Sequence, residues 1–177
     1  MGLTTPIWGR VYADMLLDEV VSLKRFLQPR LEPELAVVLA EALPEEASLE
    51  AIWQAIEGFC LVVDILDTAW QGYRFAAVEV IADNSSGGGF VLGNRLGSDK
   101  LEGNLRLFLN GRLATEGPIE SLGKPVERLR WLANAVGGLE VGQIVFLGSP
   151  AAAVPAEPGV LEIFGPDGTG MIVKLAE

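Results

Sequence analysis

The sequence predicts one α+β domain over residues 1–177, in which short strands outnumber helices. Glycine and proline are frequent, with 21 and 10 of 177 residues, and this density of turn formers favours short strands joined by turns. Only two segments have a clear helical spacing of apolar residues, and a third matches it less well. Strands and helices do not alternate, which argues against a doubly wound parallel sheet.

The helices follow from capping residues and apolar spacing. The first begins after Ser48, a favourable N-cap, and Gly58 stops it. The second has Pro125 in its first turn and ends at Gly137. The apolar residues at helical spacing are Leu49, Ile52, Trp53 and Ile56 in the first helix, and Val126, Leu129, Leu132, Ala133 and Val136 in the second. A third helix is expected over residues 12–23.

Strands are expected where apolar or alternating runs lie between turn signals. They cover the later half of 26–39, then 106–109, 143–147, 160–164 and 171–175. Asn110 and Gly111 indicate a tight hairpin turn after the second of these runs. The glycine-rich residues 165–170 join the last two runs into a closing hairpin.

The charge and residue content exclude several classes of function. With 24 acidic and 13 basic residues, the formal net charge is -11, so we expect neither a nucleic-acid partner nor a membrane partner. The chain has no histidine, which excludes a Ser-His-Asp relay and an imidazole zinc site. Cys60, the single cysteine, lies in an apolar run and is expected to be a small buried hydrophobe. The lack of a disulfide framework, signal peptide and bilayer-length apolar run predicts a cytoplasmic protein.

Two glutamates stand at the start of an apolar strand. Glu32 and Glu34 are two residues apart, so in extended structure both side chains leave the same face. Each negative charge raises the pKa of the other unless a cation lies between them. Pro33 cannot donate a ladder hydrogen bond, which indicates a strand entrance or an edge where a site could open.

Asp64 interrupts the apolar run 59–66. An unpaired carboxylate in such surroundings costs several kcal/mol, so it requires a cationic partner or a metal. In one interpretation the glutamate pair faces solvent and Asp64 pairs with an arginine, for which the candidates are Arg25, Arg30 and Arg74. In the other, the three carboxylates form one site, and such an all-oxygen set suits hard cations such as Mg²⁺, Mn²⁺ or Ca²⁺.

A polar turn and a glycine run lie between two apolar segments. We expect a strand over 80–82 to run into the turn, whose candidate substrate-binding residues are Asp83, Asn84, Ser85 and Ser86. The turn is either a capped wide hairpin or a loop whose backbone N–H groups approach a substrate carboxylate. Ser149 has the same two interpretations, as a turn cap or a substrate contact.

Together these segments resemble the 2-keto-4-pentenoate hydratase group, which includes 4-oxalocrotonate decarboxylase, within the fumarylacetoacetate hydrolase superfamily. The matching residues are 8–10, 25–36, 82–86, 90–93, 131–134, 147–149 and 154–155. The resemblance covers nearly the whole chain and implies the family's unusual mixed, β-rich α+β fold with two or three helices.

The resemblance also implies a metal site. Glu32 and Glu34 match the family's Glu-x-Glu ligand pair, and Asp64 takes the position of the third ligand, which is usually a glutamate. Ala69 stands where relatives have an arginine. The implied ion is Mg²⁺ or Mn²⁺, which would chelate the carboxylate and 2-oxo oxygens of a small 2-oxo acid and stabilise its enolate.

The start of the chain departs from the family pattern. Relatives have an N-terminal segment that ends in a lysine, thought to act in acid–base steps, just before a Gly-Leu-Thr-Ser-like stretch. Here residues 2–5 form that stretch directly after Met1, so the family lysine is absent and the catalytic residue is unknown. We expect either a naturally shortened relative or a start placed too late.

Two functions are therefore expected. The first is a divalent-metal-dependent lyase, a hydratase or decarboxylase of aromatic-compound catabolism, acting on a small 2-oxo or 2-hydroxydienoate acid. The alternative is a non-catalytic or impaired relative that keeps the fold and metal site and acts as a partner subunit. The mean hydropathy of +0.35 is high, so we expect a homo-oligomer or a hetero-oligomer with a related subunit.

Overall fold

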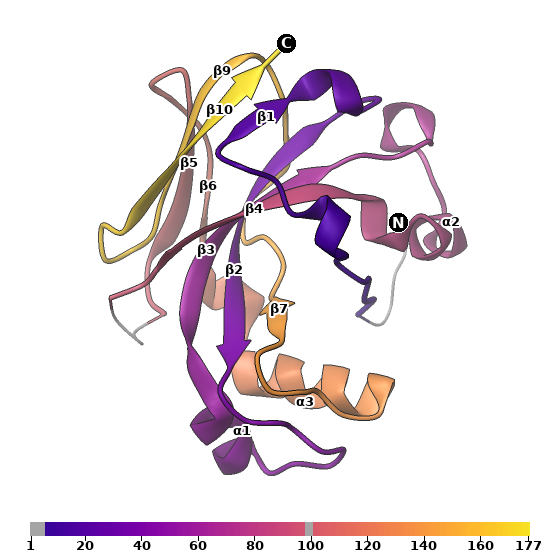
Figure 1. The fold of residues 1–177 in the computed structure, drawn as a ribbon, viewed down its shortest axis with the longest axis vertical. Coiled ribbons are helices and arrows are strands. Elements are labelled where there is room, and N and C mark those ends of the chain that lie inside the picture. Colours follow the sequence, from indigo (N-terminus) through magenta and orange to yellow (C-terminus); the bar gives the residue numbers. More distant parts are fainter. Residues whose placement is uncertain (1–5, 98–100) are drawn as a thin grey trace.

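Within residues 6–97 and 101–177, which the computed structural model describes, the chain folds into two sheets with short helices around them (Figure 1). The strands are β1 (Val20–Ser22), β2 (Arg30–Leu39), β3 (Ile56–Leu66), β4 (Gly87–Arg95), β5 (Asn104–Leu109), β6 (Arg112–Pro118), β7 (Ile144–Phe146), β8 (Val154–Pro155), β9 (Gly159–Phe164) and β10 (Gly170–Ala176). The α-helices are α1 (Leu49–Ala55), α2 (Ala77–Ala82) and α3 (Pro125–Val136). The 3-10 helices are η1 (Ala13–Met15), η2 (Leu23–Arg25), η3 (Gln71–Tyr73), η4 (Asn84–Ser86) and η5 (Ile119–Leu122). Residues 2–5, which carried part of the family comparison, lie outside the described residues.

The two sheets have different strand orders. One runs β1-β10-β9-β5-β6, and the other runs β4-β3-β2-β7, with β8 also paired to β2. Only the short β1 pairs in parallel, with β10, and the other neighbours are antiparallel. This mixed arrangement confirms the predicted β-rich α+β class.

The main core lies between the two sheets. Leu35 and Leu61 from β2 and β3 pack in one cluster with Leu107 and Ile163 from β5 and β9, and all four are fully buried. Helices α1 and α3 lie together at one end of the second sheet (Figure 1) and close the core there. Because side chains alternate along a strand, the opposite face of β2 and β3 is left for other residues, and this face carries the acidic groups.

Several local predictions are confirmed. The Ser48 side chain accepts a hydrogen bond of 3.2 Å from the backbone N–H of Ala51 at the start of α1. Helix α3 begins at Pro125 and ends before Gly137, whose φ of 85° is the left-handed cap conformation that glycine favours. Strands β5 and β6 form the predicted hairpin, and β9 pairs with β10 as expected.

The predicted helix over 12–23 is wrong. That segment forms η1, an extended stretch and β1, and η2 begins at its end. The β-branched Val21 is buried and pairs with Leu175 of β10, and the N–H of Lys174 donates to the carbonyl of Glu19 at 2.7 Å. Pairing with a distant strand outweighs the local helical spacing here.

The predicted strand over 80–82 is also wrong, because these residues belong to α2. The Glu79 side chain accepts a 2.5 Å hydrogen bond from the N–H of Ala76 and caps this short helix, and Val80 is buried. The third helix of the fold is therefore α2. A smaller difference concerns the first helix, which ends at Ala55, so that Ile56 and Gly58 belong to β3.

Cys60 is buried, as predicted, and lies against Ala36, Val62 and Phe90 in a small second apolar cluster. This cluster occupies the same face of the second sheet as the acidic residues, farther along β2 and β3. None of the helices in the described part of the chain is long and apolar enough to cross a membrane.

Candidate metal centre

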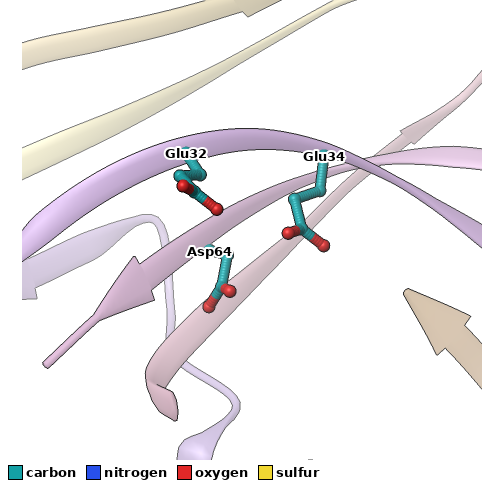
Figure 2. Close-up of side chains that lie close together, drawn as sticks. All are labelled: Glu32, Glu34 and Asp64. Carbon is teal, nitrogen blue, oxygen red and sulfur yellow. The ribbon is translucent and has the colours of Figure 1, made fainter. Parts of the chain in front are cut away.

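Three carboxylates lie together on one face of the second sheet (Figure 2). Glu32 and Glu34 project from β2, and Asp64 of β3 lies directly opposite Glu32 in the antiparallel register. One carboxylate oxygen from each residue lies within 4.8 Å of the others. The strand pleat thus places side by side three groups that are up to 32 positions apart in the sequence.

Pro33 lies inside β2 and not at its entrance, which corrects the first of the two positions expected for it. It pairs with Val63 of β3 on one side, but on the other side of β2 it lies in a gap between β8, which pairs before it, and β7, which pairs after it. The Ser149 hydroxyl donates to the carbonyl of Pro33 at 2.9 Å in this gap. Proline, which has no backbone N–H, is tolerated at this position because no strand on that side needs a hydrogen-bond donor, so the position is locally a sheet edge.

Burial and mutual repulsion make these carboxyls weak acids. Burial raises the pKa of Glu32 to about 7. The pKa of Asp64 also rises to about 7, through burial and then the charge of Glu32. Burial, with the charges of Asp64 and Glu32, raises the pKa of Glu34 well above its usual value, against smaller lowering effects of a Gly148 backbone hydrogen bond and the Arg128 charge. The cluster therefore favours bound protons or a bound cation.

No ion pair of the described residues involves the cluster. The ion pairs there join Arg95 to Glu57 and Lys124 to Glu127. Arg30, the first residue of β2, lies over the ring of Tyr73 at 4.3 Å from the ring centroid. Among the described residues, Asp64 therefore forms no ion pair with any of its three candidate partners, Arg25, Arg30 and Arg74, which argues against that interpretation.

The donor set fits a hard divalent cation. Carboxylate oxygens are the ligands that Mg²⁺, Mn²⁺ and Ca²⁺ prefer, and neither nitrogen nor sulfur is among the clustered groups. Two or three negative charges this close, largely removed from water and without a cation, repel one another strongly. A divalent ion would relieve that repulsion and replace the lost solvation.

A large cleft of about 1460 Å³ opens beside the cluster, and Glu34 and Asp64 line it. Phe90 of β4 and Phe146 of β7 form part of its wall, with their ring centroids 5.0 Å apart in an edge-to-face arrangement. On other sides it is bounded by the segment before η1, by the 83–86 loop and by α3. The cleft gives a small molecule access to the carboxylates.

The 83–86 loop lies at the rim of this cleft but only part of it faces the opening. Asn84 and Ser85 line the cleft, whereas Asp83, Ser86 and Ser149 do not. The Asn84 side chain makes two 2.8 Å hydrogen bonds to the backbone of Arg10, accepting from its N–H and donating to its carbonyl. It therefore ties the N-terminal segment to the loop.

The loop backbone is unusual. Asn84, Ser85 and Ser86 have φ angles of 49°, 61° and 61°, in the left-handed region that side chains other than glycine rarely adopt. The buried hydroxyls of Ser85 and Ser86 have no hydrogen-bond partner within residues 6–97 and 101–177. The hydroxyl of Thr68 donates to the carboxylate of Asp83, which fixes that residue inside the fold. Strain together with an unpaired polar atom is typical of functional loops.

Two further features were not predicted. The Asp67 carboxylate accepts 2.8 Å hydrogen bonds from the N–H groups of Leu27 and Gln28, and it anchors the segment that leads into β2. Lys124 and Arg128 line the cleft beside α3. Lys124 directly precedes α3 and Arg128 lies in its first turns, and this pair of cations at a predicted helix start is the signal that could have identified them.

Comparison with protein families identifies a match over most of the chain. The family described as fumarylacetoacetate (FAA) hydrolase C-terminal matches residues 15–166. A 4-oxalocrotonate decarboxylase of Pseudomonas sp is 32% identical over 170 residues, which is 90% of this chain and 66% of that protein. The 2-keto-4-pentenoate hydratase 1 of Dechloromonas aromatica (strain RCB) is 28% identical over 187 residues, 99% of this chain and 71% of that protein.

The fold has relatives among solved structures. The 4-oxalocrotonate decarboxylase from Pseudomonas putida G7, complexed with magnesium and adipate, superposes with a TM-score of 0.90 at 24% identity, covering 99% of this chain and 72% of that chain. Its complex with calcium and acetate gives a TM-score of 0.87 at 23% identity, covering 98% of this chain and 71% of that chain. The chain spans about two thirds of the length of the curated relatives that it matches.

Proposed function

The chain belongs to the fumarylacetoacetate hydrolase family, and we propose that it is a divalent-metal-dependent lyase acting on a small 2-oxo acid. The observation that carries the proposal is the cluster of Glu32, Glu34 and Asp64, three buried or half-buried carboxylates without a cationic partner among the described residues. The cluster borders a cleft that is large enough for a small organic acid. The names of the relatives, hydratase and decarboxylase, support a lyase.

These three carboxylates would hold the ion, which we propose to be Mg²⁺ or Mn²⁺. When bound, the ion supplies a Lewis acid that offsets negative charge on the carboxylate and 2-oxo oxygens of the acid. Magnesium and calcium in the complexes of the Pseudomonas putida G7 decarboxylase support a divalent ion. The raised pKa values of Glu32 and Asp64 imply that protons compete with the ion near neutral pH.

The loop beside the cleft would orient the substrate. We propose a direct contact for Ser85, because its hydroxyl has no hydrogen-bond partner in the described part of the chain and the residue lines the cleft. Asn84 would act mainly by holding the N-terminal segment through Arg10. Asp83, Ser86 and Ser149 would support the loop and the strand gap without touching the substrate, which assigns three of the expected substrate-binding residues to positioning.

The apolar wall has a separate role in the proposed reaction. Phe90 and Phe146 exclude water from one side of the cleft, which strengthens electrostatic interactions with the substrate.

Assembly into a homo-oligomer or with a related subunit stays a prediction. Light scattering at micromolar concentration tests it, and a strictly monomeric mass would contradict it.

The test is a lyase assay of the purified chain with Mg²⁺ or Mn²⁺ on 2-hydroxypenta-2,4-dienoate and 4-oxalocrotonate. We expect turnover that requires the ion and is abolished in the Glu34→Gln variant. Binding of the ion is measured in parallel by calorimetry, with Glu41→Gln, an exposed glutamate beyond β2, as the matched control. Ion binding without turnover would favour the non-catalytic alternative, and the absence of both would refute the proposed site.

A further inference from the structure

The start of β2 is fastened to the segment that follows β3. Gln28 lies two residues before β2, and residues 67–73 come directly after β3. The side-chain amide of Gln28 donates hydrogen bonds of 2.8 Å and 2.7 Å to the carbonyls of Thr68 and Trp70. Its Oε1 accepts one of 2.8 Å from the N–H of Gly72. We call the hydrogen bonds between Gln28 and this segment the Gln28 clasp.

The backbone of Gln28 belongs to the clasp as well. Its N–H donates to the Asp67 carboxylate at 2.8 Å, and its carbonyl accepts from the Tyr73 hydroxyl at 3.2 Å. Every polar group of this half-buried residue thus has a partner in the segment 67–73. Gly72 and Tyr73 have φ angles of 67° and 60°, in the left-handed region. Such backbone persists in a residue like tyrosine where surrounding contacts hold it, and both residues are bonded to Gln28.

The segment 67–73 is also fixed from another side. The N–H of Asp67 donates to the carbonyl of Ser86 at 2.8 Å, and the hydroxyl of Thr68 donates to the carboxylate of Asp83. The Gln28 clasp therefore attaches the start of β2 to a part of the fold that is itself anchored on the 83–86 loop.

The clasp lies at the end of the β2–β3 ladder that carries the carboxylates. The last pair of this ladder is Arg30 with Leu66, and the pair of Glu32 with Asp64 lies two positions farther in. Figure 2 shows Glu32 and Asp64 on these two neighbouring strands. On the other side of β2, no strand of the described residues pairs with it at Glu32. The position of Glu32 relative to Asp64 therefore depends on β3 and on what holds the ladder end together.

The clasp and the carboxylates are close enough to interact. Burial, and then the charge of Asp67, raises the pKa of Tyr73 to about 12, against the lowering effect of Arg30. The charges of Asp64 and Glu32 add to this rise. When both carboxylates are ionised, their repulsion acts to separate the strand ends, and the clasp opposes that separation. A site whose ligands are held in place before the ion arrives binds it more tightly.

We propose that Gln28 is a positioning residue for the candidate metal centre, because its clasp keeps Glu32 opposite Asp64. The inference rests on the proposed function, since it assumes that these carboxylates bind the ion. Gln28 does not line the cleft, so its effect passes through the two strands and not through the substrate. Without the clasp, the ligands must be ordered when the ion binds, and the affinity for the ion falls while the number of ions bound stays the same.

The test compares Gln28→Met, which keeps the side-chain length and removes its hydrogen bonds, with Gln71→Met as the matched control. Gln71 is an exposed glutamine of η3 outside the clasp. Calorimetric titration of the purified chain with Mn²⁺ gives the Kd and the number of ions bound. We expect Gln28→Met to bind the same number of ions with a Kd raised about tenfold, as for other residues that act through metal ligands. The control should match the wild type.

Two further measurements separate positioning from a general loss of stability. Thermal unfolding in EDTA is recorded for each variant, and a lower unfolding temperature of Gln28→Met with an unchanged Kd would overturn the inference. Hydrogen exchange in EDTA should be faster in Gln28→Met over residues 30–34 and 62–66, and saturating Mn²⁺ should restore the protection. Exchange at the wild-type rate over these residues would also count against positioning by Gln28.

Tyr73→Phe covers the case in which Gln28→Met does not fold. It removes only the hydrogen bond to the Gln28 carbonyl and keeps the ring over which Arg30 lies. It should raise the Kd for Mn²⁺ by about two- to fivefold, and a wild-type Kd would overturn the inference. A wild type that binds Mn²⁺ no more tightly than the variants leaves the proposed function standing, whereas a wild type that binds no ion overturns both.

Discussion

Glu32 of β2 lies directly opposite Asp64 of β3, so the antiparallel register itself holds two carboxylates side by side on a largely buried face. Such a pair is unfavourable for the fold when both groups are ionised. The sequence retains it, with Glu34 beside it, at the edge of the cleft of about 1460 Å³. The cost to the apo protein and the proposed affinity for a cation thus have the same structural origin.

The first prediction concerns the stability of Glu34→Gln with and without the ion. In EDTA near neutral pH the variant should unfold at a higher temperature than the wild type. On folding, the buried Glu34 must either ionise beside two other carboxyls or take up a proton, and both cost stability. With millimolar Mg²⁺ or Mn²⁺ the order should reverse, because only the wild type gains stability from binding, about 3 kcal/mol at a hundred times the Kd. Thermal unfolding followed by circular dichroism measures both, and a variant that keeps the full ion-induced gain would show that Glu34 is not a ligand.

The second prediction concerns the pH dependence of the apo protein. The pKa values of Glu32 and Asp64 rise on folding from 4.5 and 3.8 to about 7, so the folded chain binds protons more tightly than the unfolded chain. The stability that these two protonated carboxyls contribute is complete below about pH 4 and is lost as the pH rises towards 7. Ordinary salt-bridged carboxylates have the opposite pH dependence, because they stabilise the fold when ionised. In EDTA, urea unfolding should show that Glu32→Gln gains about 1–3 kcal/mol on the wild type between pH 4 and pH 8.

The same titration predicts how ion binding responds to pH. Since the ligands must be ionised, the affinity for Mg²⁺ should rise from pH 5.5 to pH 8 and each binding event should release protons below pH 7. Calorimetry in buffers of different ionisation enthalpy counts these protons. A pH-independent affinity over this range would mean that the cluster does not bind the ion.

The fourth prediction concerns the two hydrogen bonds between Asn84 and Arg10. Asn84→Gly keeps the left-handed backbone accessible but removes both bonds, so the N-terminal segment should detach from the rim of the cleft. We expect a loss of about 1–3 kcal/mol in global stability or, if opening is local, faster hydrogen exchange over residues 8–12. Asn94→Gly, which removes one exposed bond to Gly170 on a different surface, is the control, and equal exchange at 8–12 in both variants would contradict the prediction.

The sequence was informative wherever the deciding interactions are local or periodic. Ser48 and Pro125 predicted the two helix starts, and the two-residue spacing of Glu32 and Glu34 predicted their common face. The segment 12–23 shows where local patterns fail. Its apolar spacing is compatible with a helix, but the pairing of Val21 with Leu175 joins positions more than 150 residues apart, and no local signal reveals that partner.

The candidate site shows the same division. That Asp64 needs a cation follows from its apolar neighbours, but its position opposite Glu32 depends on the register between β2 and β3. The different roles of the residues in the 83–86 loop also could not be predicted from the sequence, because they depend on which polar side chains form hydrogen bonds within the fold. The Thr68 hydroxyl donates a hydrogen bond to Asp83, and the backbone N–H of Arg10 donates one to the side chain of Asn84. Neither contact follows from sequence spacing.

The last prediction concerns the length of the third acidic side chain. The described geometry brings the carboxylate of Asp64 within 4.8 Å of the two glutamates, so we expect this shorter acid to serve in place of the glutamate that the resemblance implies. Asp64→Glu keeps the charge and adds one methylene to a tightly packed face, and it should retain ion binding within about tenfold of the wild type. Asp64→Asn keeps the size and removes the charge, and it should weaken binding by about a hundredfold or more, since it takes one anionic ligand from a doubly charged cation. Calorimetric titration with Mn²⁺ distinguishes the two, and an Asp64→Asn variant that binds as tightly as Asp64→Glu would show that charge at this position does not hold the ion.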